Sequence, residues 1–262
     1  MSRKARHRFF LLLSWRVSSS TPGEGDCAPF GKPGELPGAG VVDLWLVPLA
    51  DWPEPPEAWS HALSAEERSR ASRYHFPHDA QCFMRCRAAL RALLGRYLAL
   101  SPSELVFRSG RFGKPRLETP LHFNVSHSQD LALMAFTTVG PAGVDLEAVT
   151  HDLPAVDLAT YFTDSESNLV CQADSHPDQI RTFLRLWTRK EAVLKAAGCG
   201  LSMPLHSIDV SAVDCVLEVV TDFGLTASFR VEDLSLPGGF VGAVAAPVES
   251  RLGDIRYFGR PG

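Results

Sequence analysis

Paired cysteines are missing from this sequence of 262 residues. The six cysteines form no C-x-x-C pair and no metal-ligand pattern with the histidines; they are Cys27, Cys82, Cys86, Cys171, Cys199 and Cys215. The familiar spaced-cysteine motifs of redox pairs and zinc fingers are therefore not present in the sequence. Scattered cysteines are typical of packing roles in a reducing compartment, so we expect a cytoplasmic protein.

An excess of positive charge and a long apolar run are also missing. The formal net charge is -4, so no global positive field attracts nucleic acid. No uninterrupted apolar run reaches the length needed to cross a membrane. We therefore expect neither nucleic acid nor a membrane as a partner. We also expect a monomer.

Two common catalytic signatures are absent as well. The loop GRFGKP (110–115) lacks the spacing of a P-loop and the Ser or Thr after its lysine, although Lys114 lies in a turn fixed by glycine and proline. FNVSHS (123–128) contains no G-x-S-x-G turn, so Ser126 and His127 are not expected to form a catalytic pair. A hydrogen-bonding pair for a phosphate fits these two residues better.

The chain divides into four parts by composition and pattern. Residues 1–40 are rich in Gly, Pro and Ser after a short basic and apolar start, and we expect a disordered leader. Residues 41–139 and 140–248 each contain strand patterns with helical patterns between them. This doubling predicts two similar α+β halves with a cleft where they meet. Residues 249–262 are left as a tail.

Local signals place several elements. Ser64 followed by Glu67, and Thr163 followed by Glu166, have the spacing of capping boxes that open helices. Long helices are expected over 79–99 and 178–197, and strands over 41–49, 131–139 and GVDLEAV (143–149), with three further strand candidates in 206–247. The basic clusters Arg85–Arg87–Arg91 and Arg181–Arg185–Arg189–Lys190 are interpreted first as solvated helix faces and second as phosphate sites.

Three acids stand out. Asp145 and Glu147 lie two apart in a predicted strand, so their carboxylates share a face and repel unless a cation or proton intervenes. Glu191 lies in an apolar row of the helix 178–197, where burying an unpaired carboxylate costs several kcal/mol. A Mg²⁺ ion held by all three acids relieves both problems, because Mg²⁺ prefers oxygen ligands and binds substrate phosphates. Alternatively, Asp145 and Glu147 end a solvated strand and Glu191 pairs with Lys195 on the helix surface.

The order of these motifs resembles a known family. GKPRL, FNVSHS, GVDLE, YFTDSE and WTRKEAVLKAAGCGLSMPL follow one another as in 4′-phosphopantetheinyl transferases of the large single-chain type that activates surfactin synthetase and related enzymes. The resemblance spans about residues 41–247 and leaves both ends of the chain unexplained.

The resemblance implies a fold, an activity and roles for residues. The family fold is a pseudo-dimer of two α+β halves with coenzyme A in the cleft. The reaction transfers phosphopantetheine from coenzyme A to a serine of an acyl or peptidyl carrier protein and releases 3′,5′-ADP. By motif position, Asp145, Glu147 and Glu191 hold Mg²⁺, Glu191 is also the base, and Lys195 binds the pyrophosphate and assists the departing phosphate. Ser126 and His127 meet the 3′-phosphate side, joined by Lys114 and Arg70, and Asp145 contributes to the coenzyme A site.

One departure concerns cations. Relatives often carry arginines after the position of Asp79, where this chain has Ala80, Gln81 and Cys82. Arg87 and Arg91 are the candidates to replace them, or else they face solvent. For the acidic carrier protein we expect a local docking patch between Phe162 and the helix carrying Arg181–Lys190.

Two alternatives stay open. The same acids suit a Mg²⁺-dependent phosphodiesterase or nuclease, which would release product without a protein acceptor. A carrier-binding module without activity is the other alternative, although the intact set Asp145, Glu147, Glu191 and Lys195 argues against it.

Overall fold

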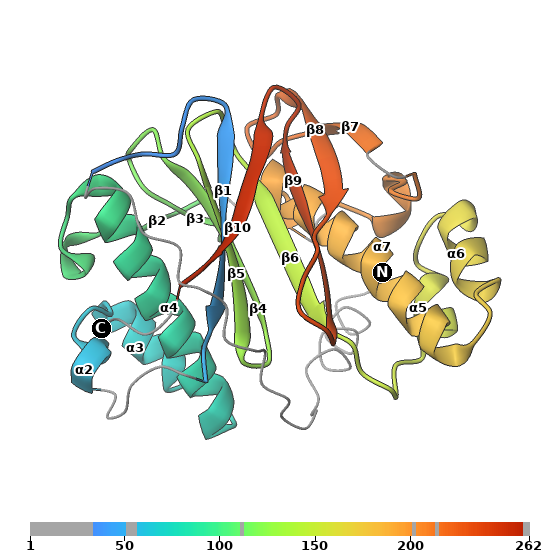
Figure 1. Cartoon of the computed structure of the whole chain (residues 1–262), viewed down its shortest axis with the longest axis horizontal. Coiled ribbons are helices and arrows are strands. Elements are labelled where there is room, and N and C mark those ends of the chain that lie inside the picture. Colours follow the sequence, from blue (N-terminus) through green and yellow to red (C-terminus); the bar gives the residue numbers. More distant parts are fainter. Residues whose placement is uncertain (1–33, 51–56, 111–112, 201–202, 213–214, 259–262) are drawn as a thin grey trace. The chain divides into compact units, whose positions relative to one another are not determined.

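The computed structural model of the chain describes residues 34–50, 57–110, 113–200, 203–212 and 215–258 (Figure 1). These residues divide into two compact units, one formed by residues 141–248 and the other by residues 34–140 together with 249–258. Each unit combines helices with a four-stranded sheet, so the predicted α+β class is confirmed. Most of the expected leader lies outside the described residues. Within them, no helix has both the length and the apolar character that a membrane span requires.

The unit containing the N-terminal half is built on a mixed sheet. Its strand order is β10 (Arg251–Tyr257), β1 (Val41–Pro48), β5 (Leu131–Thr137) and β4 (His122–Ser128). The helices are α2 (Glu57–Ser60), α3 (Ala65–Ala71), α4 (Pro77–Leu98) and the 3₁₀ turn η1 (Pro102–Glu104), and a small hairpin pairs β2 (Arg108–Ser109) with β3 (Pro115–Arg116). Leu90, Leu93 and Leu94 of α4 pack in one cluster with Trp45 and Phe136 of the sheet.

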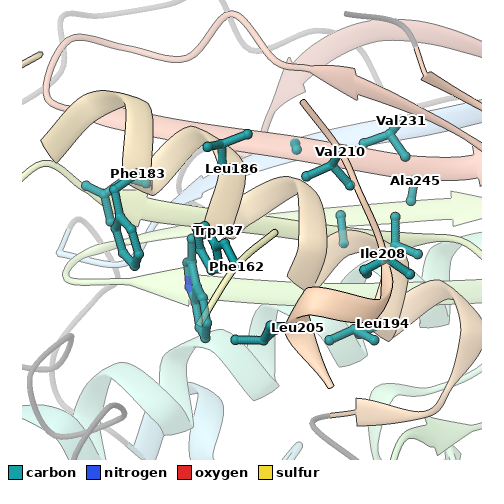
Figure 2. Packing of buried hydrophobic residues seen from close by; sticks show 14 of the residues in the cluster. Phe162, Phe183, Leu186, Trp187, Leu194, Leu205, Ile208, Val210, Val231 and Ala245 are labelled. Carbon is teal, nitrogen blue, oxygen red and sulfur yellow. The ribbon is translucent and has the colours of Figure 1, made fainter. Parts of the chain in front are cut away.

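The other unit has an antiparallel sheet. Its strand order is β6 (Gly143–Ala148), β9 (Phe240–Pro247), β8 (Thr226–Asp233) and β7 (Cys215–Val220). The helical elements are α5 (Ala155–Ala159), α6 (Asp164–Cys171), α7 (His176–Ala197) and the 3₁₀ turn η3 (Leu205–Ser207). Figure 2 shows the core of this unit, in which Leu186 and Trp187 of α7 belong to the same cluster as Val231 and Ala245 of the sheet.

Each unit uses its capping-box glutamate twice. Both predicted boxes are present, and each is completed by the glutamate, Glu67 before α4 and Glu166 before α7. Glu67 also binds Arg87 and Arg91 of α4, each through Nε at 2.7 Å. Glu166 binds Lys190 of α7 at 2.6 Å, with both side chains fully buried. In each unit, therefore, the glutamate that begins one helix also anchors a cation of the following 22-residue helix.

The C-terminal segment, expected as a tail, contributes a strand to the first unit. β10 pairs in parallel with β1 and places Arg256 against Asp43, with Nη2 3.1 Å from Oδ1. Asp43 is buried and also accepts a hydrogen bond from the Tyr97 hydroxyl at 2.7 Å. Arg256 therefore supplies a positive charge to a buried carboxylate 213 positions earlier in the chain.

We expect Arg256→Ala to destabilise the protein by about 2 kcal/mol, because it leaves Asp43 buried without its cation. The loss is smaller than for a fully buried pair, since the Arg256 side chain is 33% exposed. Urea unfolding measures the change as a lower midpoint with an unchanged slope. The matched control is Arg251→Ala, which removes an exposed arginine from the same strand. Equal stability of the two variants would contradict the role given to Arg256.

Candidate active site

Strand β6 presents its two acids to helix α7. Gly143, Asp145 and Glu147 alternate along β6 and share the face toward α7, since Lys195 of α7 contacts Asp145. Val144 and Leu146 point to the opposite face and are fully buried there. The convergence of the two carboxylates on one face of the strand is therefore present in the structure.

A glycine lets α7 approach β6 closely. A Cβ atom on Gly143 would lie only 2.0 Å from the backbone oxygen of Ala192 and 2.5 Å from the nitrogen of Ala196. The cross-strand neighbours of Gly143 and Asp145 on β9 are Ala245 and Ala243, which are also small. Small side chains on all three elements thus set the distance between the helix and the acids.

Lys195 lies directly against Asp145. Its Nζ is 2.6 Å from Asp145 Oδ1 and donates a second hydrogen bond to the Val144 carbonyl at 3.2 Å. Burial disfavours its ammonium, but the negative charges of Asp145 and Glu191 outweigh that effect and raise the Lys195 pKa. The side chain keeps 26% of its surface exposed. Lys195 is therefore a charged, partly accessible cation at the acid cluster.

Glu191 is buried in the row where the helical spacing places it. Only 8% of the residue is exposed, and among the described residues its Oε1 atom has no hydrogen-bond partner. Burial, reinforced by the negative charge of Asp145 and opposed by Lys195, raises the Glu191 pKa to about 7. A buried carboxylate oxygen without a donor costs free energy unless a proton or a cation satisfies it. Glu191 is thus poised to take either one at neutral pH.

The donor set suits a hard cation. Asp145, Glu147 and Glu191 offer only oxygen ligands. The negative charge of Asp145 helps to raise the Glu191 pKa, and both carboxylates raise the Lys195 pKa, so a positive charge is favoured here. The oxygens of the three acids do not all lie within 4.8 Å of one another, whereas the ligand atoms of His78, Cys82 and Asp130 do so elsewhere in the described chain. The acids suit a Mg²⁺ ion in donor chemistry and charge, but their oxygens would have to approach one another to share it.

Aromatic packing lies behind the acid cluster on α7. Trp187 is buried and stacks against Phe183, which in turn stacks on Phe162 with ring centroids 5.0 Å apart (Figure 2). Nζ of Lys190 lies 5.1 Å from the Phe162 ring. Trp187 is thus a core residue that fixes the helix carrying Glu191 and Lys195.

The expected phosphate-binding residues lie in the unit of residues 34–140. Ser126 and His127 are neighbours in β4, so their side chains point to opposite faces of the sheet. Ser126 is buried and His127 is exposed. The two side chains therefore do not lie side by side, and their contact with a phosphate stays a prediction.

Lys114 and Arg70 are held in defined places. The turn before Lys114 contains Gly113 with a φ of 84°, a backbone conformation that favours glycine. The pKa of His122, an exposed residue of β4, is lowered by the partial burial of its ring and further by the positive charges of Lys114 and Arg116. Arg70 is exposed on α3, and its guanidinium stacks 5.0 Å from the Phe83 ring.

The interpretation of the basic clusters as solvated helix faces is wrong for four of their members. Arg85, Arg91, Arg189 and Lys190 are buried. Arg189 binds Asp233 through two nitrogens, and Lys190 binds Glu166, so neither is available in the expected docking patch. Arg181 and Arg185 remain exposed there. Arg87 and Arg91 do not face solvent either, because both bind Glu67.

Two features of the site lie beyond the sequence predictions. The strand pattern predicts Gly143 only as the first residue of a strand, although it sets the approach of α7. The Val144 carbonyl is a backbone group that no side-chain pattern reveals. For Gly143 a signal does exist, since it lies two residues before Asp145 and shares its face.

Comparison with known proteins covers most of the chain. Residues 141–245 match the family described as the 4′-phosphopantetheinyl transferase superfamily. Residues 50–139 match a second description, 4′-phosphopantetheinyl transferase, N-terminal. The two matches meet at the boundary between the two units.

Curated relatives agree with these matches. The chain is 38% identical over 178 residues to the 4′-phosphopantetheinyl transferase HetI of Nostoc sp., covering 65% of this chain and 73% of the relative. It is 36% identical over 200 residues to a putative 4′-phosphopantetheinyl transferase of Synechocystis sp., covering 74% of this chain and 79% of the relative. It is 30% identical over 156 residues to the 4′-phosphopantetheinyl transferase Sfp of Bacillus subtilis, covering 59% of this chain and 68% of the relative.

Proposed function

Because the chain belongs to the 4′-phosphopantetheinyl transferase superfamily, we propose that it transfers the 4′-phosphopantetheine group of coenzyme A to a serine of apo acyl or peptidyl carrier proteins. The products are the holo carrier and 3′,5′-ADP. The observation that carries the proposal is the buried Glu191 beside Asp145 and Lys195, because this arrangement combines a carboxylate lacking a donor with a fixed ammonium group.

The acids Asp145, Glu147 and Glu191 would hold Mg²⁺. When bound, the ion supplies charge neutralisation at the pyrophosphate of coenzyme A. Support for this assignment comes from the oxygen-only donor set and from the unsatisfied Oε1 of Glu191.

Glu191 would accept the proton of the carrier serine hydroxyl, directly or through a water. Without metal, burial raises the Glu191 pKa to about 7, close to the pH at which a base acts best. The bond between the serine oxygen and phosphorus forms while the bond from phosphorus to the 3′,5′-ADP oxygen breaks.

Lys195 would hold its proton throughout and stabilise the departing phosphate. Its ammonium form is favoured by Asp145 and Glu191, and its partial exposure leaves room for a further hydrogen bond.

The coenzyme A phosphates would be bound by the second group of residues. His127, exposed on β4, and Ser126, its buried neighbour, would meet the 3′-phosphate side of coenzyme A. Lys114 and Arg70 add positive charge. Since these residues and the acids belong to different units, coenzyme A bound in a cleft between the two halves is part of the proposal.

For the carrier protein, the candidate docking patch reduces to the exposed part of α7 and its neighbours. Arg181 and Arg185 supply positive charge one turn apart, and Tyr161 and Leu169 are exposed apolar side chains of the same unit. A carrier with an acidic surface around its serine would meet this combination.

Intact-mass measurement of a panel of apo carriers, incubated with coenzyme A and Mg²⁺, tests the function. We expect a gain of one phosphopantetheine group on at least one carrier, with equimolar 3′,5′-ADP. Release of 3′,5′-ADP without any carrier would instead indicate a phosphodiesterase. Carrier binding without a mass change would indicate an inactive binding module.

A further inference from the structure

A second cluster of metal-ligand atoms lies at the start of helix α4, away from the three acids in the sequence. His78 and Cys82 are four residues apart on α4, and the third member, Asp130, lies in the turn between β4 and β5. The spacing of four residues brings the imidazole and the thiol to one face of the helix. The sequence showed no familiar pattern joining cysteine to histidine, because the third ligand comes from 48 positions further along the chain.

The three atoms form a triangle of nearly equal sides. Sγ of Cys82 is 3.5 Å from Nε2 of His78 and 3.4 Å from Oδ1 of Asp130, and Nε2 of His78 is 3.7 Å from the same Oδ1. In a tetrahedral zinc site, bonds of about 2.0–2.3 Å place neighbouring ligand atoms about 3.3–3.6 Å apart. The observed triangle therefore matches one face of such a tetrahedron without any movement of the backbone.

Both supporting elements are fixed. Asp130 follows Gln129, which has a φ of 52°, and its carbonyl accepts a hydrogen bond from the Leu49 nitrogen at 2.7 Å. The thiol of Cys82 is buried, whereas the side chains of His78 and Asp130 are 62% and 45% exposed. A metal bound by the three atoms would thus have the sulfur on its buried side. Its fourth coordination position would face solvent and could be taken by water.

We propose that His78, Cys82 and Asp130 bind a divalent transition metal of the zinc type, in a site distinct from the three acids. One thiolate, one imidazole and one carboxylate suit Zn²⁺ or Co²⁺ and do not suit Mg²⁺, which prefers oxygen ligands. Binding replaces the hydrogen bond from the thiol to Asp130 with two metal bonds, and the thiol proton passes to solvent. The metal then ties the first turns of α4 to the β4–β5 turn.

Burial and neighbouring charged residues determine how tightly the Cys82 thiol holds its proton. Burial raises the Cys82 pKa to about 12, with further contributions from Asp130 and Asp79, whereas Arg85 opposes the shift. Without metal, the sulfur therefore keeps its proton at neutral pH.

Titration of the chelator-treated full chain with Co²⁺, in excess Mg²⁺, tests the site. Thiolate coordination gives a sulfur-to-cobalt charge-transfer absorption in the near ultraviolet, and the three acids cannot produce this signal because they contain no sulfur. We expect the absorption to saturate at one Co²⁺ per chain and to be displaced by Zn²⁺. It should be absent in Cys82→Ser and present in the matched control Cys86→Ser, another buried cysteine one turn later on α4.

Because the side chains of His78 and Asp130 are exposed, variants at these two positions should fold. His78→Ala and Asp130→Asn should weaken Co²⁺ binding by at least about tenfold. Zn²⁺ should raise the midpoint of thermal unfolding of the wild type but not of Cys82→Ser. An absorption that survives in Cys82→Ser, or that never appears in the wild type, would overturn the proposal and leave the cluster as a hydrogen-bonded group only.

Discussion

We expect Glu191→Gln to reduce phosphopantetheine transfer by roughly 10²–10⁴-fold while the protein stays folded. Glutamine has nearly the same shape as protonated glutamate, so it fits the buried site, but it can neither accept a proton nor bind a cation as an anion. The rate of holo-carrier formation, followed by intact mass, measures the loss. The matched control is Glu218→Gln, which changes an exposed glutamate of the same unit and should transfer normally.

The pH dependence of the unfolding free energy of Glu191→Gln provides a second test, independent of the transfer rate. The Glu191 pKa rises from 4.5 to about 7 on folding in the metal-free protein, mainly through burial. The folded state therefore favours the protonated form, and the stability contributed below pH 4.5 is lost as the pH rises through about 7. An uncharged glutamine at this position does not titrate, so the variant escapes this loss. In the presence of a chelator, the variant should thus gain stability relative to the wild type between pH 5 and pH 8.

Urea unfolding at these two pH values measures the difference. Near-normal transfer by Glu191→Gln would refute the role of Glu191 as base and ligand. A difference in unfolding free energy that does not change with pH would refute its burial as a carboxylate.

Local patterns predicted the local structure well. The capping boxes at Ser64 and Thr163 rest on residues three positions apart, and both helices begin where the boxes place them. Helix α7 begins two residues before its predicted start and ends at the predicted Ala197. The apolar helical row also predicted that Glu191 is buried. Such a prediction is possible because helical periodicity depends only on spacing along one segment.

Charge burial could not be predicted in the same way. Arg91 and Arg189 resemble surface residues in the sequence because their partners, Glu67 and Asp233, lie 24 and 44 positions away. The parallel pairing of β10 with β1 is equally non-local, joining the two ends of the described chain. For the metal cluster at Cys82, helical spacing brings His78 close, but only the fold brings Asp130.

In the candidate site, too, local patterns predict some residues, whereas the contacts between elements depend on the fold. D-x-E in a strand and a glutamate in an apolar helical row were enough to nominate Asp145 and Glu191. The contact between Lys195 and Asp145 depends on how closely α7 packs on β6, and that distance is set by residues without distinctive chemistry. Gly143 is the clearest of these, because its contribution is the absence of a side chain.

We therefore expect Gly143→Ala to cost about 1–3 kcal/mol of stability or more, because its Cβ would collide with backbone atoms of α7 rather than with a flexible side chain. Relief requires α7 to move away from β6. That movement separates Lys195 from Asp145, now 2.6 Å apart, and shifts Glu191 with the same helix. Since a displacement of about 1 Å can cost about 10²-fold in rate, transfer should fall by that order.

Two controls separate this positioning effect from general damage. Gly238→Ala adds a methyl group where nothing lies within 4 Å and should change neither stability nor transfer. Val219→Ala removes buried apolar volume from β7 in the same core, so it should lower the unfolding midpoint but leave transfer at saturating coenzyme A intact. If Gly143→Ala loses stability yet transfers as well as Val219→Ala, the close approach of α7 serves the fold and not the reaction.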